Sequence, residues 1–376
     1  MRKKVLVILF FIGIFGFSLT SLIKKDRTFS ENENRYLANC PKPTIETVFN
    51  GKFEKEYETY VTDQFVLRDS MIGLKTYADL CLGKVESNGV YLGKKGYLME
   101  KFDYKTFETE LAKENEDALC EFVKDHAELV KEGRLQVLLV PTATQILQDK
   151  LPPLAVPYNQ HLILERIKDK IPAAFVPVED SLKMHGKEAL FYRTDHHWTT
   201  LGAYYGYKAW AKKSGVKPLP TTAFHRKEVT KEFYGTLSSK VNIYLKPDNI
   251  QLYYPKEPRE YQLDYDLGVS QKKSLYDMEA LKKKDKYAVF LGGNYGLVDI
   301  KTQVKNGRKL VIIKDSFAHS MVPFLTEHFE ELYMVDLRYY NASIKTFIKE
   351  NKITDILVLY NLSNLATDRT IKRINK

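Results

Sequence analysis

The stretch that decides the predicted fold is LVIIKDSFAHS, residues 310–320. Its first four residues are apolar and three of them are β-branched, which favours a buried strand that ends at Asp315 and Ser316. We expect a helix to begin directly after this strand. A serine on such a turn presents its hydroxyl at the carboxyl edge of the sheet, where ligands bind in open α/β folds. Ser316 is therefore a candidate nucleophile, and the first backbone N–H groups of the helix could stabilise an oxyanion. The alternative is that Asp315 or Ser316 simply caps the helix.

Other apolar runs of the same kind occur on both sides of this stretch. They are LQVLLV at 135–140, AFVPV at 174–178, and the segments 332–337 and 356–360. Helical stretches separate them. Buried strands that alternate with helices predict a three-layer α/β domain with a parallel, flavodoxin-like sheet.

The segment between the two halves of this pattern has a different character. Residues 215–307 are rich in Tyr, Lys and Pro and show no alternation of strands and helices. We interpret them as a mixed α/β insertion that roofs a cleft; the alternative architecture is two separate domains divided near Pro218. Before the first strand, the spacing predicts helices over 47–82 and 107–131 and a β-hairpin over 89–98.

The N-terminus carries one long apolar segment. Residues 5–23 (VLVILFFIGIFGFSLTSLI) contain no charge and are flanked by basic residues on both sides. As a helix they would span about 29 Å, close to the hydrocarbon thickness of a bilayer. No small-residue cleavage site follows, which favours an uncleaved signal anchor within 1–27. We expect a single-pass membrane protein whose body, 28–376, lies outside the cytoplasm; the alternative is secretion after signal cleavage.

Composition excludes several classes of protein. The net charge is +10, but the segments flanking the apolar run contribute half of it. No dense Lys/Arg block with interleaved aromatics is present, so nucleic-acid binding has little support. The three cysteines, Cys40, Cys81 and Cys120, are too few and too scattered for a disulfide framework or a cysteine-based metal site.

A second stretch with chemical potential is Arg193-Thr194-Asp195-His196-His197-Trp198-Thr199. An Asp two residues before a His can accept the Nδ1 proton, so that the other ring nitrogen serves as a general base. The alternatives are a helix N-cap at Thr194 or Asp195 with Trp198 in the core, or a metal site that lacks an identifiable third ligand. His319 ranks below His197, because we expect it to point away from the sheet edge.

Two later strand ends also finish with polar residues. Arg338 follows 332–337 and Asn361 follows 356–360. Either side chain could donate a hydrogen bond to an oxyanion or substrate, or could be a structural turn residue.

Together these motifs resemble a known family. Asp195-x-His197-Trp198 followed by Asp315-Ser316-Phe317 is similar to the DHHW family, which belongs with the AlgX/AlgJ-like branch of the SGNH hydrolase superfamily. FSENENR at 29–35, DQFVLRD at 63–69 and GVYLGKKGYL at 89–98 support the resemblance. It implies a Ser316–His197–Asp195 triad and a circularly permuted order, with Asp-x-His before the serine. Lys314 stands where the pattern usually has Gly, which could crowd the nucleophile turn.

The resemblance also implies a function. We expect extracytoplasmic O-acetyl transfer onto a cell-surface or exported polysaccharide through an acyl-serine, without a cofactor or a metal ion. The donor would come from a membrane-bound acyltransferase partner, because acetyl-CoA is cytoplasmic. The alternatives are a carbohydrate esterase with the same triad and a non-catalytic polysaccharide-binding or scaffold protein.

Overall fold

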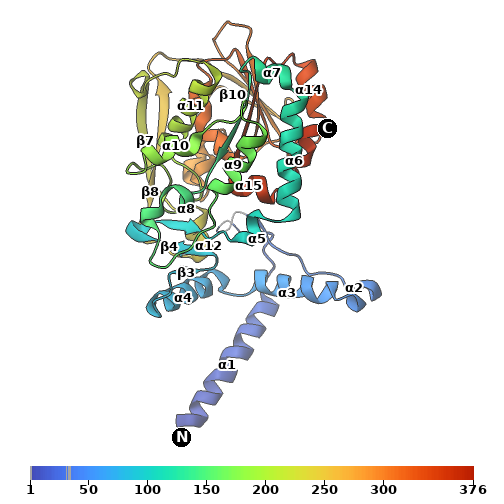
Figure 1. The fold of residues 1–376 in the computed structure, drawn as a ribbon. Coiled ribbons are helices and arrows are strands. Elements are labelled where there is room, and N and C mark those ends of the chain that lie inside the picture. Colours follow the sequence, from blue (N-terminus) through green and yellow to red (C-terminus); the bar gives the residue numbers. More distant parts are fainter. Residues whose placement is uncertain (1, 31, 33–34) are drawn as a thin grey trace. The chain divides into compact units, whose positions relative to one another are not determined.

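The computed structural model describes residues 2–30, 32 and 35–376 of the chain (Figure 1). Glu31, Glu33 and Asn34 of the 29–35 motif therefore lie outside the described residues. The chain forms two compact units: residues up to Asn88 with Ser238–Ile243, and Gly89–Leu237 with Tyr244–Lys376. The described chain on both sides of Pro218 belongs to the second unit, so the alternative of a domain boundary there is not supported.

A seven-stranded sheet with the order β10-β9-β11-β13-β12-β14-β6 organises the larger unit. Its parallel part consists of β6 (Leu135–Val140), β12 (Lys309–Lys314), β13 (Glu331–Val335) and β14 (Asp355–Asn361). All four match predicted apolar runs. Because β12 lies between β13 and β14, the residues that follow it emerge at the centre of the parallel edge.

Helices cover both faces of this sheet, as the strand pattern requires. Leu310 and Ile312 of β12 pack in one apolar core with α10 (Val178–Met184) and α11 (Thr200–Ser214). Val311 and Ile313 pack in the opposite core, whose helices are α6 (Glu110–Asp125), α9 (His161–Lys170), α14 (Ile344–Glu350) and α15 (Leu362–Thr367). Figure 1 shows α10 and α11 on one side of the strands and α6 and α14 on the other. The predicted three-layer architecture is confirmed.

One predicted strand is largely absent. The run at 174–178 contributes only an isolated parallel bridge between Val137 and Phe175, and α10 already begins at Val178. Pro177 (φ −78°, ψ +66°) lies at the centre of a tight turn in which the N–H of Val178 donates to Val176 O instead of to β6, which explains why pairing stops.

The middle segment is only partly separate from the sheet. β7 (Phe224–Phe233) and β8 (Asp248–Pro255) form their own antiparallel pair. β9 (Gln262–Tyr265), β10 (Ser270–Lys272) and β11 (Leu297–Lys301) instead extend the central sheet, with β11 antiparallel to β13. Besides any role as a roof, residues 215–307 thus supply three strands of the central sheet, which the sequence analysis did not predict. These strands lack the continuous apolar runs of buried parallel strands, so the sequence pattern did not mark them.

Shorter elements complete the larger unit. The predicted hairpin is confirmed as β4 (Val90–Leu92) and β5 (Leu98–Glu100), joined through η1 (Lys94–Gly96). The predicted helix over 107–131 is divided into α6 and α7 (Ala127–Lys131), which meet at His126. The remaining elements are α5 (Tyr104–Phe107), α8 (Ala143–Ile146), η2 (Gln148–Lys150), η3 (Thr221–Ala223), η4 (Met278–Lys282), η5 (Lys286–Val289), η6 (Ser316–Met321), α13 (Val322–Leu325) and η7 (Ile371–Asn375).

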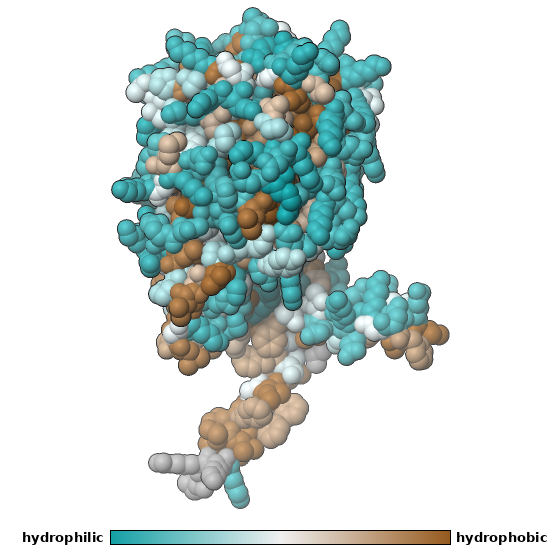
Figure 2. Space-filling view, viewed as in Figure 1, coloured by the Kyte–Doolittle hydropathy of each residue, from teal (hydrophilic) through white to brown (hydrophobic). Residues whose placement is uncertain are grey.

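The smaller unit begins with α1 (Arg2–Ile23), in which Lys4–Ser21 is long and apolar enough to cross a membrane (Figure 2). The predicted helix over 47–82 is three helices: α2 (Ile45–Phe49), α3 (Lys52–Gln64) and α4 (Arg68–Cys81). The chain turns at Gly51 (φ +72°) and at Leu67 (φ +57°), both in the left-handed region that interrupts a helix. The unit also holds the short strands β1 (Phe29–Ser30), β2 (Arg35–Tyr36) and β3 (Glu86–Ser87), together with most of α12 (Thr236–Val241).

The central position of β12 gives a stability prediction. Ile312 is fully buried, so Ile312→Ala should lower the unfolding free energy of the larger unit by about 2–5 kcal/mol, and Ile312→Val by only about 0.5–1.5 kcal/mol. Urea denaturation followed by fluorescence reports on this unit, because Trp198 and Trp210 are both buried in it. Equal stability of the alanine variant and the wild type would contradict the packing described.

Candidate active site

The nucleophile turn is built around Asp315, directly after β12. Asp315 Oδ1 accepts the N–H of Phe317 at 2.9 Å and therefore caps η6. Its Oδ2 accepts the backbone N–H of Asn361 at 2.8 Å and the amide of Asn364 at 2.7 Å. Burial raises the pKa of Asp315, and these donors oppose that effect. Asp315 thus ties the turn to the start of α15, whereas Ser316 beside it is only half-buried.

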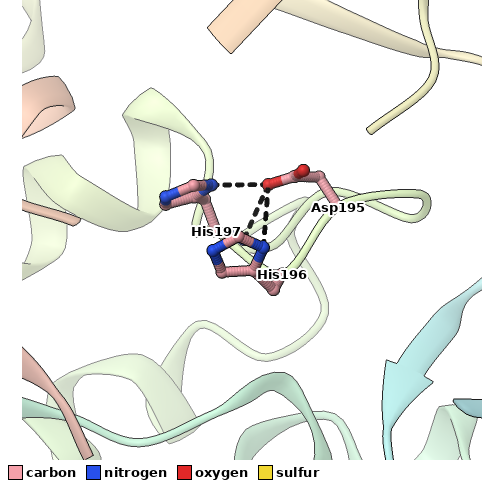
Figure 3. A group of neighbouring side chains, drawn as sticks. All are labelled: Asp195, His196 and His197. Carbon is pink, nitrogen blue, oxygen red and sulfur yellow. Dashed lines mark hydrogen bonds and ion pairs between the residues drawn. The ribbon is translucent and has the colours of Figure 1, made fainter. Parts of the chain in front are cut away.

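Ser316 meets the Asp-x-His motif through a continuous chain of hydrogen bonds. Its Oγ lies 2.7 Å from His197 Nε2, and His197 Nδ1 lies 2.6 Å from Asp195 Oδ1. Because the carboxylate accepts the Nδ1 proton, Nε2 can accept the proton of the serine. Figure 3 shows Asp195 Oδ1 directed at both histidine rings. His196, however, has its hydrogen bond with Thr236 Oγ1, at 2.7 Å. The hydrogen bonds predicted among Ser316, His197 and Asp195 are therefore present, and the catalytic role of these residues stays a prediction.

Thr236, from the middle segment, fixes the carboxylate of Asp195. Its N–H and its hydroxyl donate to Asp195 Oδ2 at 2.9 and 3.0 Å. The neighbouring Gly235 comes so close that an added Cβ would lie 2.2 Å from the Cβ of Asp195. Only glycine leaves room for this approach.

Asp248, at the start of β8, fixes the backbone of the same loop. Its carboxylate accepts the N–H groups of Arg193 and Thr194 at 2.9 and 2.8 Å and the Thr194 hydroxyl at 2.7 Å. Sequence reasoning missed both Thr236 and Asp248. No motif surrounds either residue, and only the tertiary fold brings them to the loop.

Trp198 connects the histidine loop to the nucleophile turn. Its indole N–H donates to the carbonyl oxygen of Phe317 at 2.9 Å, and its side chain is fully buried. The helix that follows, α11, is capped by Thr199, whose side chain accepts the N–H of Gly202. The alternative N-cap at Thr194 or Asp195 was therefore wrong, although burial of Trp198 is confirmed.

Lys314 does not crowd the turn. Its ammonium is buried and lies 2.8 Å from His319 Nε2 and 3.2 Å from Asp336 Oδ2. Burial lowers the pKa of Lys314, and Asp336 opposes that shift. Burial, reinforced by the charge of Lys314, holds the pKa of His319 well below its usual value, so a neutral ring accepts from the lysine. His319 is thus the hydrogen-bond acceptor of Lys314, and His197 is the histidine bonded to Ser316.

The two predicted oxyanion donors, Arg338 and Asn361, differ in their burial and in their hydrogen-bond partners. Arg338 binds Asp336 with two bonds, Nε to Oδ1 at 2.9 Å and Nη2 to Oδ2 at 2.6 Å, and its side chain stays 34% exposed. Its charge also contributes to lowering the pKa of His197, after the larger effects of burial and His196. Asn361 is a cap: its Oδ1 accepts from Ser363 and its amide donates to Val140 O at 3.1 Å. A role as oxyanion donor stays a prediction for both.

Electrostatics suit His197 to act as a base. Burial and, after it, the neighbouring His196 lower its pKa to about 4, although Asp195 opposes the shift. Burial would raise the pKa of Asp195, but His196, His197 and the Thr236 N–H outweigh it and hold that pKa well below its usual range. The pair is therefore a carboxylate and a neutral imidazole at neutral pH.

The metal alternative fits this geometry less well. Asp195, His196 and His197 do offer ligand atoms within 4.8 Å of one another. The 2.6 Å separation of Asp195 Oδ1 and His197 Nδ1, however, is that of a direct hydrogen bond. Two ligands about 2 Å from a tetrahedral zinc ion lie farther apart.

Comparisons with known proteins agree with this fold. A family model described as DHHW protein matches residues 87–335, which include the whole triad. A DHHW family protein of Eubacterium siraeum superposes with a TM-score of 0.59 and 25% identity, over 77% of this chain and 96% of its own. PatB1 of Bacillus cereus, solved with a sulfonyl adduct, gives a TM-score of 0.62 at 23% identity, over 76% of this chain and 98% of PatB1. The fold is the SGNH-like one that the motifs implied.

A curated relative gives a similarity at the level of sequence. The probable alginate O-acetylase AlgJ of Pseudomonas syringae pv. tomato is 27% identical over 238 residues, 58% of this chain. The chain spans 59% of the length of that relative.

The lowered pKa of His197 predicts how Ser316 reactivity depends on pH. A base is active when neutral, so reactivity should rise with pH through about 4 rather than through the ordinary histidine value. The rate of Ser316 modification by a sulfonyl fluoride, followed by mass spectrometry between pH 3.5 and 8, should therefore change little from about pH 5.5 upwards. A midpoint at or above about 6.5, the value of an unperturbed imidazole, would contradict this electrostatic description.

Proposed function

The chain belongs to the DHHW family, and from this membership together with the triad geometry we propose that it is an SGNH-type O-acetyltransferase acting on an extracytoplasmic polysaccharide. The observation that carries the proposal is the hydrogen-bonded series Ser316–His197–Asp195 at 2.7 and 2.6 Å, placed at the carboxyl edge of the parallel sheet. A helix cap would explain Asp315, but it would not explain a half-buried serine bonded to a buried histidine.

The proposed reaction has two balanced halves. Ser316 Oγ attacks the acetyl carbonyl carbon of the donor while its proton moves to His197 Nε2. The bond to the donor's leaving group breaks, the leaving group takes that proton, and acetyl-Ser316 remains. A sugar hydroxyl then gives its proton to His197 and attacks the acetyl carbonyl, and the oxygen of Ser316 leaves and regains the proton. Both halves balance with the triad alone, so the proposal includes no cofactor and no metal ion.

Each half passes through a tetrahedral oxyanion that needs donors. We propose the N–H of Ser316, at the first position of η6, as one of them. The N–H of Phe317 is unsuited, because Asp315 already accepts it. Arg338 or the amide of Asn361 is the proposed side-chain donor, and the partly exposed guanidinium is the better placed to meet a substrate.

The acceptor and the donor are inferred from different facts. A relative named as an alginate O-acetylase supports a polysaccharide acceptor. For the donor we propose a membrane-bound acyltransferase partner that hands acetyl groups across the membrane, since acetyl-CoA is cytoplasmic.

The product separates the transferase from its alternatives. The purified full chain should convert an activated acetyl ester and a glycan into acetyl-glycan. Release of acetate alone, unchanged by glycan, would instead identify a carbohydrate esterase with the same triad. Glycan binding without any turnover of the ester would identify a scaffold protein.

Variants of the triad should show that its members act as one unit. Ser316→Ala, His197→Ala and the double variant should each lose turnover of the acetyl ester by similar factors, at least about 10³-fold, because removing either member stops proton transfer to and from the nucleophile. Asp195→Asn should lose less than the others with the fold intact. Full activity in Ser316→Ala, or losses that multiply in the double variant, would contradict the proposed mechanism.

We also propose that residues 1–27 are an uncleaved anchor and that the SGNH-like domain, 28–376, lies outside the cytoplasm. The apolar window Lys4–Ser21 supports a membrane span. Protease added to intact spheroplasts should digest the domain and spare cytoplasmic control proteins. Complete protection would contradict this topology, and release of the protein into the medium would show that the anchor is cleaved.

A further inference from the structure

Tyr287 contacts both partners of the Ser316–His197 hydrogen bond. Its ring stacks on the imidazole of His197 with the centroids 3.8 Å apart and the planes 10° apart. Its hydroxyl lies 3.2 Å from the carbonyl oxygen of Ser316, which can only accept, and 3.3 Å from Ser320 Oγ. One side chain therefore holds the base through its ring and the nucleophile turn through its hydroxyl.

The surroundings of Tyr287 keep this ring in place. The residue lies on η5 in the middle segment and is only 5% exposed. It belongs to a buried cluster in which Phe290 and Tyr192 lie 5.1 and 6.3 Å from its ring centroid. Because Tyr287 is packed on several sides, its ring cannot move with the imidazole of His197, and it therefore restricts rotation of that imidazole.

The stacked ring of Tyr287 meets two requirements of a catalytic base, a fixed orientation and the exclusion of water. Proton transfer needs the plane of the imidazole to direct Nε2 at Ser316 Oγ, and small misplacements of a catalytic group cost large factors in rate. Water on the face of the ring would compete for its nitrogens and weaken the electrostatic contacts within the site. The titratable and charged groups that act on this base are Asp195 and His196 on its own loop, His319 on η6 and Arg338 after β13. Asp285, beside η5, acts on Asp195 and His196.

We propose that Tyr287 is a positioning residue for His197: its stacked ring fixes the plane of the imidazole and keeps water from that face, while its hydroxyl ties the ring to the nucleophile turn. The inference rests on the proposed function, because it assumes that Ser316 is the nucleophile. It also gives the middle segment a part in catalysis that no motif of the sequence indicates.

The test uses the detergent-solubilised full chain and phenylmethanesulfonyl fluoride, which modifies activated serines without need of the natural substrate. Mass spectrometry of the Ser316 peptide follows the rate, and Ser316→Ala defines the background. Tyr287→Met removes the ring but fills much of its volume, and Tyr287→Leu repeats the test should the methionine variant fail to fold. Tyr287→Phe keeps the ring and removes only the hydroxyl.

Tyr276 offers a matched control. It lies in the same buried cluster, its ring packs on Phe290 at 6.1 Å and on Tyr254 at 5.0 Å, and its hydroxyl donates to Tyr253 O at 2.6 Å. Tyr276→Met therefore removes comparable packing from the cluster at a residue whose partners lie outside the triad.

We expect Tyr287→Met to slow labelling about 10-fold or more, Tyr287→Phe to stay within about 3-fold of the wild type, and Tyr276→Met to label at the wild-type rate. The pH midpoint of labelling should rise from about 4 toward the ordinary histidine value in Tyr287→Met alone, since burial is the main cause of the lowered pKa of His197. Wild-type labelling by Tyr287→Met, or equal losses in the two methionine variants, would overturn the role of Tyr287. Absence of labelling in the wild-type chain would instead overturn the proposed function itself, and this inference with it.

Discussion

The hydrogen bond between Ser316 and His197 joins two segments that are 119 residues apart in the sequence. Everything described around it reduces the freedom of one partner or the other. The central strand β12 brings the serine to the middle of the parallel edge. The indole of Trp198 then fastens the histidine loop to the residue after the serine, through a bond of 2.9 Å to Phe317 O. Ordering two distant segments costs conformational entropy, and these non-local contacts offset that cost.

The middle segment stabilises the site from the other side. Thr236 holds the carboxylate of Asp195, Asp248 holds the backbone that precedes it, and Tyr287 covers the face of the imidazole. Three strands of the same segment also continue the central sheet beyond β13. This arrangement explains how an active site can be rigid although its motif is a short loop: the loop is enclosed by groups from a part of the chain that is anchored in the sheet.

The buried charges of Lys314 and Asp336, next to the nucleophile turn, are also paired with other groups. Lys314 would be costly in an apolar core, but it lies between Asp336 and the neutral ring of His319. Asp336 in turn binds Arg338 with two hydrogen bonds, so that burial, which would raise its pKa, is outweighed and the carboxylate stays charged. Lys314 is therefore part of a network that reaches the partly exposed guanidinium of Arg338.

Short sequence patterns predicted the features that depend on neighbouring residues. Continuous apolar runs identified β6, β12, β13 and β14, and the spacing of Asp195 and His197 predicted their hydrogen bond. The patterns failed where partners are distant: nothing in the sequence pairs Lys314 with Asp336, directs Tyr287 at His197, or marks β11 as a strand of the main sheet. At 174–178 a run that was apolar enough formed only a bridge, because Pro177 and the start of α10 end the pairing.

The most direct test of the account is the identity of the acylated residue. The full chain, mixed briefly with an activated acetyl ester and quenched in acid, should carry one acetyl group, and peptide mapping should place it on Ser316. His197→Ala, treated in the same way, should carry almost none, because the serine then has no base. An unmodified Ser316, or an acetyl group on another residue that persists in Ser316→Ala, would contradict the central claim that this serine is the nucleophile.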